Sequence, residues 1–169
     1  MRIKQIKNDK INSFEFSYDL SKGDYLKKIL ELYQIDEIYI CIFGLNDKKI
    51  FDNIQTKIEI KKFSLLSSSK SLQNFVLNIS LDEISNLLSI IDNSFDELVV
   101  WDPYTNWGNF NKSFNEPPFL TFSKASIKDD TDFYLIFKKS DFNNVEIISN
   151  LSFHNSKNIN KEELIKIFN

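Results

Sequence analysis

The stretch between Ile79 and Gly108 constrains the fold more than any other part of the 169-residue chain. Its first part places apolar residues at helical spacing, so that they form one stripe along a helix. The continuous apolar run from Leu98 to Trp101 follows and is typical of a strand buried on both faces. Because Pro103 cannot donate a hydrogen bond to a β-ladder, the strand is expected to end before it. The stripe of the helix comprises Leu81, Ile84, Leu87, Leu88 and Ile91.

The expected helix also has signals at its two ends. Ser80 and Glu83 have the spacing of a capping box, in which each side chain accepts a hydrogen bond from the other residue's backbone N–H. The turn-forming run from Asp92 to Ser94 is expected to end the helix.

An earlier stretch has the same outline of a helix followed by a buried strand. Ser21 or Asp24 is expected to cap a helix, and the run from Ile38 to Phe43 predicts a buried strand that Gly44 closes. Two interpretations remain open, an internal duplication and two unrelated helix–strand units. The apolar face of this helix comprises Leu26, Ile29, Leu30 and Tyr33.

The remaining elements are mostly strands. We predict an α+β fold in one domain spanning residues 1–169, with a mixed or largely antiparallel sheet packed by two main helices and a short C-terminal helix. The strict alternation from Thr56 to Lys62 predicts a strand with one wet face near a sheet edge, and the serine-rich run from Leu66 to Ser71 predicts a loop. Asn160 is expected to cap the terminal helix, Lys161–Phe168. Further strands are expected at residues 2–7, Phe14–Tyr18, Phe75–Ile79, Phe119–Ser123, Asp132–Lys138 and Val145–Ser149.

Charge and composition restrict the classes of function. The net charge is −3 and Arg2 is the sole arginine, so nucleic-acid binding is disfavoured. Cys41 is the single cysteine, which leaves no disulfide framework and no cysteine-based metal site. No apolar run approaches the ~18 residues of a membrane span, and the first residues have no apolar signal region. We therefore expect a cytoplasmic protein without a membrane segment, metal or other cofactor.

The segment after the central strand carries an unusual concentration of aromatic residues. Both tryptophans of the chain, Trp101 and Trp107, fall within residues 101–110. Tryptophan and tyrosine dominate interface hot spots, because they bury a large area with few rotatable bonds. One interpretation is a recognition loop presented by the strand. The other is that Trp101 belongs to the core and the remaining aromatics pin the loop to the protein. The residues predicted to bind a partner are Asp102, Tyr104, Asn106 and Trp107, with Asp129 and Asp130 from a later acidic turn.

Three weaker patterns could support catalysis or metal binding. Glu59 and Lys61, with Asp47 or Asp52 upstream, outline a PD-(D/E)xK nuclease, in which carboxylates hold Mg²⁺ and the lysine steadies the attacking water. A solvated amphipathic strand explains the same residues. His154 is the single histidine and has no Gly-x-Ser-x-Gly motif to partner it. The acidic run at 129–132 lacks the glycine and the closing glutamate of a calcium loop.

No catalytic constellation emerges, so we do not expect an enzyme. A rigid surface with aromatic anchors and acidic residues suits a protein partner, and small acidic bacterial immunity proteins, which neutralise toxin domains, are a class with this character. Their targets are often basic, and an acidic protein would associate with them at an electrostatically steered rate. The alternatives are the metal-dependent nuclease and an aromatic platform for a ligand, built from Trp101, Tyr104 and Trp107.

Overall fold

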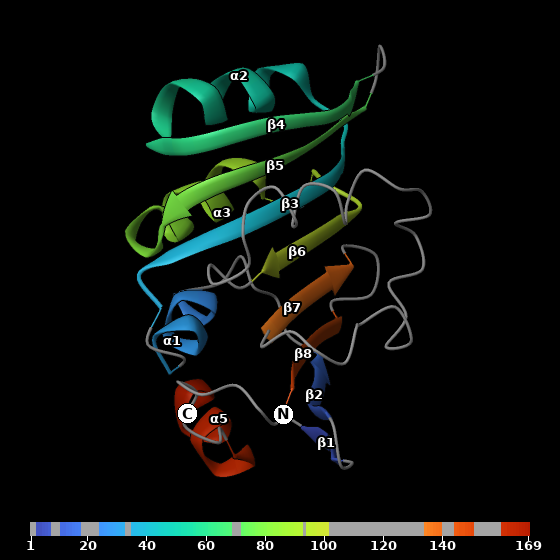
Figure 1. The fold of residues 1–169 in the computed structure, drawn as a ribbon, viewed down its shortest axis with the longest axis vertical. Coiled ribbons are helices and arrows are strands. Elements are labelled where there is room, and N and C mark those ends of the chain that lie inside the picture. The colour runs from blue at the N-terminus through green and yellow to red at the C-terminus, as the bar shows by residue number, and fades with distance from the viewer. Residues whose placement is uncertain are drawn as a thin grey trace.

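The two apolar runs of the sequence form neighbouring strands in the middle of one sheet (Figure 1). They are β3 (Glu37–Leu45) and β6 (Glu97–Trp101), which pair antiparallel with Tyr39 opposite Trp101. Successive residues of a strand point to opposite faces. Since every residue of the described ranges 38–45 and 97–100 is buried, both faces of these strands are covered. The prediction of two strands buried on both faces is confirmed.

In this computed structural model, the described residues are 3–7, 11–17, 24–32, 35–68, 72–92, 94–101, 134–139, 144–150 and 160–169. Within these ranges the chain forms eight strands, four α-helices and one short 3₁₀ helix. The elements besides β3 and β6 are β1 (Lys4–Lys7), β2 (Ile11–Ser17), α1 (Tyr25–Leu32), α2 (Lys48–Lys57), β4 (Ile60–Ser68), β5 (Gln73–Ser80), η1 (Leu81–Glu83), α3 (Ile84–Ile91), β7 (Tyr134–Lys139), β8 (Asn144–Asn150) and α5 (Lys161–Phe168).

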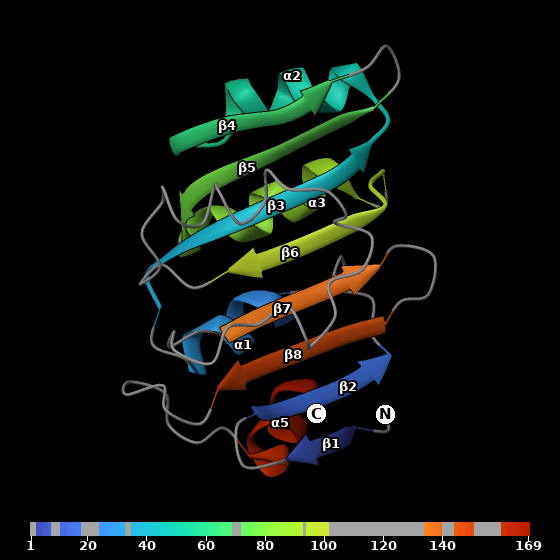
Figure 2. The ribbon, with the colours of Figure 1, turned by 45° about the vertical axis from the view of Figure 1, so that its right-hand side comes forward.

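The strands form one sheet in the order β1-β2-β8-β7-β6-β3-β5-β4, and every neighbouring pair is antiparallel. Figure 2 shows β4 at one edge and β1 at the other. Because β5 and β6 both pair antiparallel with β3, they run parallel to each other, and the η1–α3 segment connects them. The predicted α+β class with a largely antiparallel sheet is confirmed.

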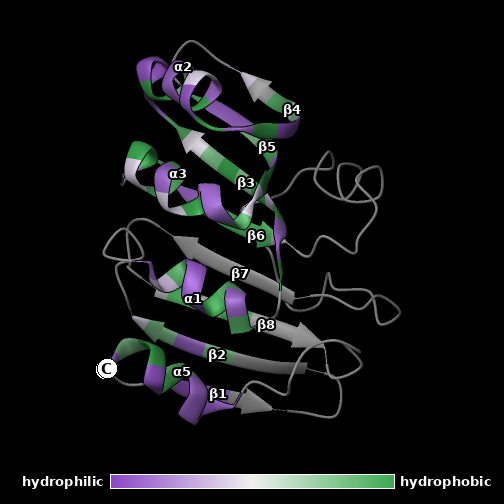
Figure 3. Ribbon diagram, turned by 90° about the vertical axis from the view of Figure 1, so that its left-hand side faces the viewer, coloured by the Kyte–Doolittle hydropathy of each residue, from purple (hydrophilic) through white to green (hydrophobic). Residues whose placement is uncertain are grey.

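All four described α-helices lie on one face of the sheet, as Figure 3 shows from the side. The main core lies between them and the strands. The predicted stripe of α3 is buried in it, and so are the three predicted core residues of α1 that the structure describes. From the sheet the core takes Phe14 and Phe16 of β2, Ile38, Ile40 and Ile42 of β3, Phe75, Leu77 and Ile79 of β5, Leu98 and Val100 of β6, and Val145 and Ile147 of β8.

The C-terminal helix α5 begins with a capping box at Asn160. Asn160 Oδ1 accepts a hydrogen bond from the Glu163 backbone N–H at 2.9 Å, and Glu163 Oε2 accepts one from the Asn160 N–H at 3.0 Å. The ring of Phe168 then stacks on Tyr25 of α1 and meets the edge of Phe16 of β2. The predicted cap and both predicted ends of this helix are confirmed, and its last turn joins α5 to the rest of the core.

Gly44 introduces an irregularity into β3 near the end of the strand. Its φ is +68°, a conformation that other residues adopt at a cost, and the register with β5 shifts between Ile42 and Leu45. The Gly44 N–H donates to Asn74 Oδ1 at 2.7 Å. A Cβ atom at Gly44 would collide with the side chain of Asp96. The expectation that Gly44 closes the strand is therefore wrong by one residue, because the bulge lets β3 continue to Leu45.

Three local predictions around β5 are wrong. The strand predicted from Thr56 to Lys62 begins only at Ile60, because residues 56 and 57 belong to α2, a helix that was not predicted. The strand also continues to Ser68, through half of the segment predicted as a loop. Ser80 forms no side-chain cap hydrogen bond, because the chain enters α3 through the 3₁₀ turn η1. The predicted position of β4 at an edge of the sheet, however, is confirmed.

Of the described helices, none is long and apolar enough to cross a membrane. The predicted strand at Phe119–Ser123 lies outside the described residues.

Candidate functional site

The six residues predicted to bind a partner lie outside the part of the chain that the structure describes. They are Asp102, Tyr104, Asn106, Trp107, Asp129 and Asp130. The structure does fix where the aromatic segment begins, because Trp101 is the last residue of β6. It lies opposite Tyr39 on one side and Leu135 on the other, so the segment leaves from the middle of the sheet.

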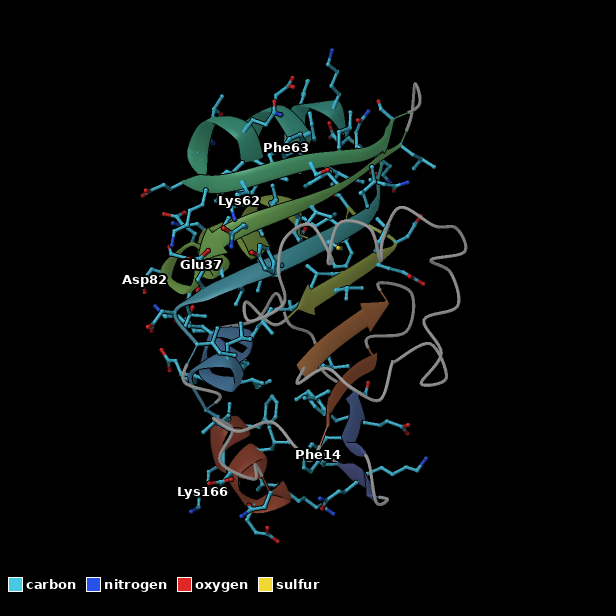
Figure 4. The ribbon with its side chains drawn as sticks, in the orientation of Figure 1. Phe14, Glu37, Lys62, Phe63, Asp82 and Lys166 are labelled. Carbon is cyan, nitrogen blue, oxygen red and sulfur yellow. The ribbon has the colours of Figure 1, made fainter. Side chains whose placement is uncertain are left out.

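Next to that point, three residues on neighbouring strands lie in register on the face opposite the helices. Lys62 of β4 is opposite Asn78 of β5, and Asn78 is opposite Tyr39 of β3. We call Lys62, Asn78 and Tyr39 the polar row. Glu37 precedes Tyr39 by two residues and therefore lies on the same face. Figure 4 shows Glu37 and Lys62 at the same end of the sheet.

Asn78 is the most unusual member of the polar row, because its side chain is fully buried. Its Nδ2 donates to the backbone oxygen of Ile38 at 3.2 Å, which fixes the orientation of the amide. Among the described residues, Asn78 Oδ1 is the one buried side-chain oxygen or nitrogen without a hydrogen-bond partner. A buried acceptor of this kind costs about 1–3 kcal/mol of stability. The residue is therefore not explained by packing alone.

The Glu37 carboxylate forms an ion pair with Lys61, whose Nζ lies 2.8 Å from Glu37 Oε2. The hydrogen bond from Lys61 lowers the pKa of Glu37 below its usual value of 4.5, and a second hydrogen bond from Asn78 acts in the same direction. The pair is partly exposed, with 39% of the Glu37 side chain open to solvent. At neutral pH the Glu37 carboxylate is therefore ionised, and the ammonium group of Lys61 balances its charge.

The Tyr39 hydroxyl completes the group as a neutral polar atom. Burial raises the pKa of Tyr39 above 10, and the nearby charge of Glu37 adds to the effect. The hydroxyl thus stays protonated at neutral pH and can donate or accept a hydrogen bond. An ion pair, an amide and a phenol suit recognition of another molecule by hydrogen bonds and charge.

The residues considered for catalysis are arranged differently from what a nuclease motif requires. Glu59 precedes β4, and the pairing between β4 and β5 shifts between Ile60 and Lys62, while Lys61 is bonded to Glu37. Asp47 caps α2 by accepting from the Lys49 N–H at 2.8 Å. Within the described ranges, no group of three or more acidic, histidine or cysteine side chains is placed to hold a metal.

The single cysteine of the chain adds no nucleophile to this site. Cys41 is fully buried, and that burial raises the pKa of its thiol well above 9.0, so the thiolate nucleophile is suppressed. His154 lies outside the described residues.

Glu37, Tyr39 and Asn78 were not predicted from the sequence as a group. A signal for Asn78 was present, because it is the one polar residue in the otherwise apolar run Phe75–Ile79. Its meeting with Glu37 depends on the pairing of β3 with β5, and the sequence does not give that register.

Comparisons with known proteins give no family. No protein-family model matches the sequence, and no curated protein matches it. Among solved structures, the ligand-free regulatory subunit of aspartate kinase from Thermus thermophilus is 13% identical, with a TM-score of 0.29 over 79% of this chain and 91% of that one. A structure of aspartokinase alpha and beta subunits is 15% identical, with a TM-score of 0.27 over 79% of this chain and 93% of that one. Likenesses at these TM-scores carry no argument about function.

Proposed function

We propose that this protein is a cytoplasmic binding protein of the immunity type, which neutralises a toxin domain by direct contact. The observation that supports the proposal is the position of Trp101. A strand buried on both faces, at the centre of an eight-stranded sheet, leads into a segment that contains Asp102, Tyr104, Asn106 and Trp107. Rigid scaffolds of this kind commonly present binding loops.

The charges of the chain are compatible with a basic partner. The net charge is −3, and Glu37 keeps its negative charge to a lower pH than an ordinary glutamate. Asp102 adds a carboxylate directly after β6, and Asp129 and Asp130 add two more. Complementary charge accelerates association and helps to exclude wrong partners. In the proposal, Tyr104 and Trp107 supply the buried contacts and the acidic residues face basic groups of the toxin.

A pull-down from the native cell lysate tests this proposal. The baits are the unchanged protein, the Tyr104→Ala/Trp107→Ala double variant, and a control in which the exposed Ile165 of α5 is replaced by alanine. We expect a stoichiometric partner that the unchanged protein and the control retain and the double variant loses. The captured protein should arrest growth when it is expressed alone, and coexpression of this protein should restore growth.

Two results would overturn the proposal. One is a partner retained equally by the double variant, which would place the interface elsewhere. The other is a captured protein that is harmless when expressed alone, because the partner would then not be a toxin.

A further inference from the structure

The two halves of the sheet contain the same sequence of elements. Strands β3, β4, β5 and β6 form one half, and with α2 and α3 they follow the order strand, helix, strand, strand, helix, strand along the chain. We call this half, residues 37–101, the inserted copy. Strands β1, β2, β7 and β8, with α1 and α5, form the other half, which we call the outer copy. Its elements come from residues 4–32 and 134–168, on either side of the inserted copy in the sequence.

An approximate two-fold axis between β6 and β7 relates the topology of the two copies. Outward from this point, the sheet order is β6, β3, β5, β4 on one side and β7, β8, β2, β1 on the other. Because every neighbouring pair is antiparallel, each strand runs opposite to its counterpart, as an axis perpendicular to the sheet requires. The inserted copy has the order β3, α2, β4, β5, α3, β6, and the outer copy has the matching order β8, α5, β1, β2, α1, β7 when it is followed from β8. The outer copy is therefore a circularly permuted version of the inserted copy.

The packing of the helices repeats in the two copies as well. Helix α2 contacts α3 in the inserted copy, the equivalent α5 contacts α1 in the outer copy, and α1 contacts α3 across the axis. In each copy an edge-on contact between two phenylalanine rings joins equivalent elements. The ring centroids of Phe51 on α2 and Phe75 on β5 are 5.3 Å apart, and those of Phe168 on α5 and Phe16 on β2 are 5.2 Å apart. The copies therefore share contacts in addition to topology.

This arrangement bears on the two helix–strand units that the sequence suggested as a possible duplication. The helices of those units, α1 and α3, are equivalent in the two copies. The strands that follow them, β3 and β6, are not equivalent, because β3 corresponds to β8 and β6 corresponds to β7. After α1 the chain enters the inserted copy, and it returns to the outer copy at β7.

The two copies differ in how far apart their paired strands lie in the sequence. All strand pairs of the inserted copy form within residues 37–101, and Tyr39 opposite Trp101 brings the two ends of this copy together. The outer copy depends on the pairing of β2 with β8, in which Ile11 lies opposite Asn150. Closing a long loop costs conformational entropy. The folded inserted copy shortens the loop that the outer copy must close, whereas the inserted copy closes its own strand pairs without the outer copy.

We propose that the inserted copy is a cooperative unit that stays folded when the outer copy opens. The outer copy needs the folded inserted copy to bring β2 and β8 within reach of each other, and the reverse dependence does not exist. Opening therefore separates β7 from β6 and releases the outer copy, in the way that proteins commonly open by contiguous units. The polar row and Glu37 belong to the inserted copy, so they stay assembled in the partly open molecules.

Native-state hydrogen exchange of the full chain at low urea concentrations tests this proposal. Ile40→Val in β3 and Ile147→Val in β8 are a matched pair of variants. Both isoleucines are buried in the core on equivalent strands, and each substitution removes one carbon atom. Each should accelerate the exchange that its side chain controls by about fivefold.

The two variants should differ in which amides they affect. Ile147→Val should accelerate exchange in both copies, because the inserted copy opens only in molecules whose outer copy is already open. Ile40→Val should accelerate exchange in the inserted copy alone, because Ile40 stays buried while the outer copy opens. The measurement involves no partner, so its outcome is independent of the proposed function.

Either of two other patterns would contradict the proposal. If Ile40→Val also accelerated exchange of the amides in β2 and β8, the copies would open as one unit or the inserted copy would open first. If Ile147→Val left exchange in the inserted copy unchanged, that copy would open while the outer copy stays folded.

Discussion

Lys61 on the edge strand β4 reaches across β5 to Glu37 on β3, with 2.8 Å between Lys61 Nζ and Glu37 Oε2. The pair thus joins two strands that are not neighbours in the sheet. It also gives Lys61 a partner different from the attacking water that it would steady in a nuclease. The relationship makes Lys61 a structural and electrostatic residue beside the polar row.

Acid titration should reveal this pair. The pKa of Glu37 is lower in the folded protein than its usual value of 4.5. The resulting stabilisation is therefore fully present above that value and is lost as the pH falls through the folded pKa. Lys61→Met should reduce the free energy of unfolding at pH 7 by less than about 1 kcal/mol, because the pair is partly exposed. The difference between the two proteins should shrink as the pH falls below 4.5 and through the lower pKa of folded Glu37. Urea unfolding at several pH values measures it, and a difference independent of pH would contradict the assignment.

Gly44 should tolerate no side chain. Gly44→Ala forces a residue with a Cβ into φ +68° and against the Asp96 side chain. We expect a loss of about 2–4 kcal/mol in the free energy of unfolding, measured by denaturant titration. The Gly44→Ala/Asp96→Gly variant removes the collision but keeps the backbone strain, so it should recover part of the loss. Full stability of the single variant would show that β3 does not need this bulge.

The two helix starts should respond differently to loss of their capping residues. Asn160→Ala removes the acceptor for the Glu163 N–H and should cost about 1 kcal/mol of unfolding free energy. Ser80→Ala should cost less than about 0.5 kcal/mol, because Ser80 forms no side-chain cap bond. Thermal unfolding of the two variants side by side measures the contrast. Equal losses would mean that Ser80 caps its helix after all.

Asp92 ends α3 with a positive φ of 43°. This conformation favours glycine, because a Cβ atom is strained there. Asp92→Gly should therefore be more stable than Asp92→Ala by about 1 kcal/mol in urea unfolding. The exposed side chain makes the comparison clean, since neither variant disturbs the core. Equal stability of the two variants would argue against a strained helix end.

The sequence was most informative where a local pattern and the global fold agreed. Continuous apolar runs identified β3 and β6, because only strands covered on both faces leave no polar side in their sequence. The Asn160 cap located α5 to the residue, because a capping side chain marks the start of a helix. Both signals are complete within about ten residues, so no tertiary information was needed.

The helix α2 was missed because two periodicities overlap in its sequence. The alternation around Ile58 and Ile60 resembles a strand, but Ile50, Ile54 and Ile58 recur at helical spacing after the Asp47 cap. This repeat of isoleucines every four residues, together with the cap, predicts the helix. The capping prediction at Ser80 failed for a different reason. The Leu81 N–H donates to the Asp36 carbonyl at 2.8 Å, so a tertiary contact sets the start of that segment.

The group formed by Glu37, Lys61 and Asn78 depends on strand register, so the sequence alone does not predict it. Glu37, Lys61 and Asn78 lie on three strands, and each residue alone reads as an ordinary part of its strand. Pairing of β3 and β4 with β5 brings them together. A shift of one residue would send Asn78 to the opposite face. The residues predicted from the aromatic and acidic segments, including Tyr104 and Trp107, remain predictions.

Because Cys41 is buried, the rate at which its thiol is chemically labelled reports unfolding of the protein. A thiol reagent needs both access to the sulfur and an accessible thiolate, and the folded protein supplies neither. Modification must therefore wait until the centre of the sheet opens, and its rate reports the population of molecules in which β3 has separated from its neighbours. We expect labelling to accelerate with urea in parallel with global unfolding. Rapid labelling without urea would reveal a local opening of β3. The protein thus contains its own probe of cooperative opening and needs no engineered cysteine for that measurement.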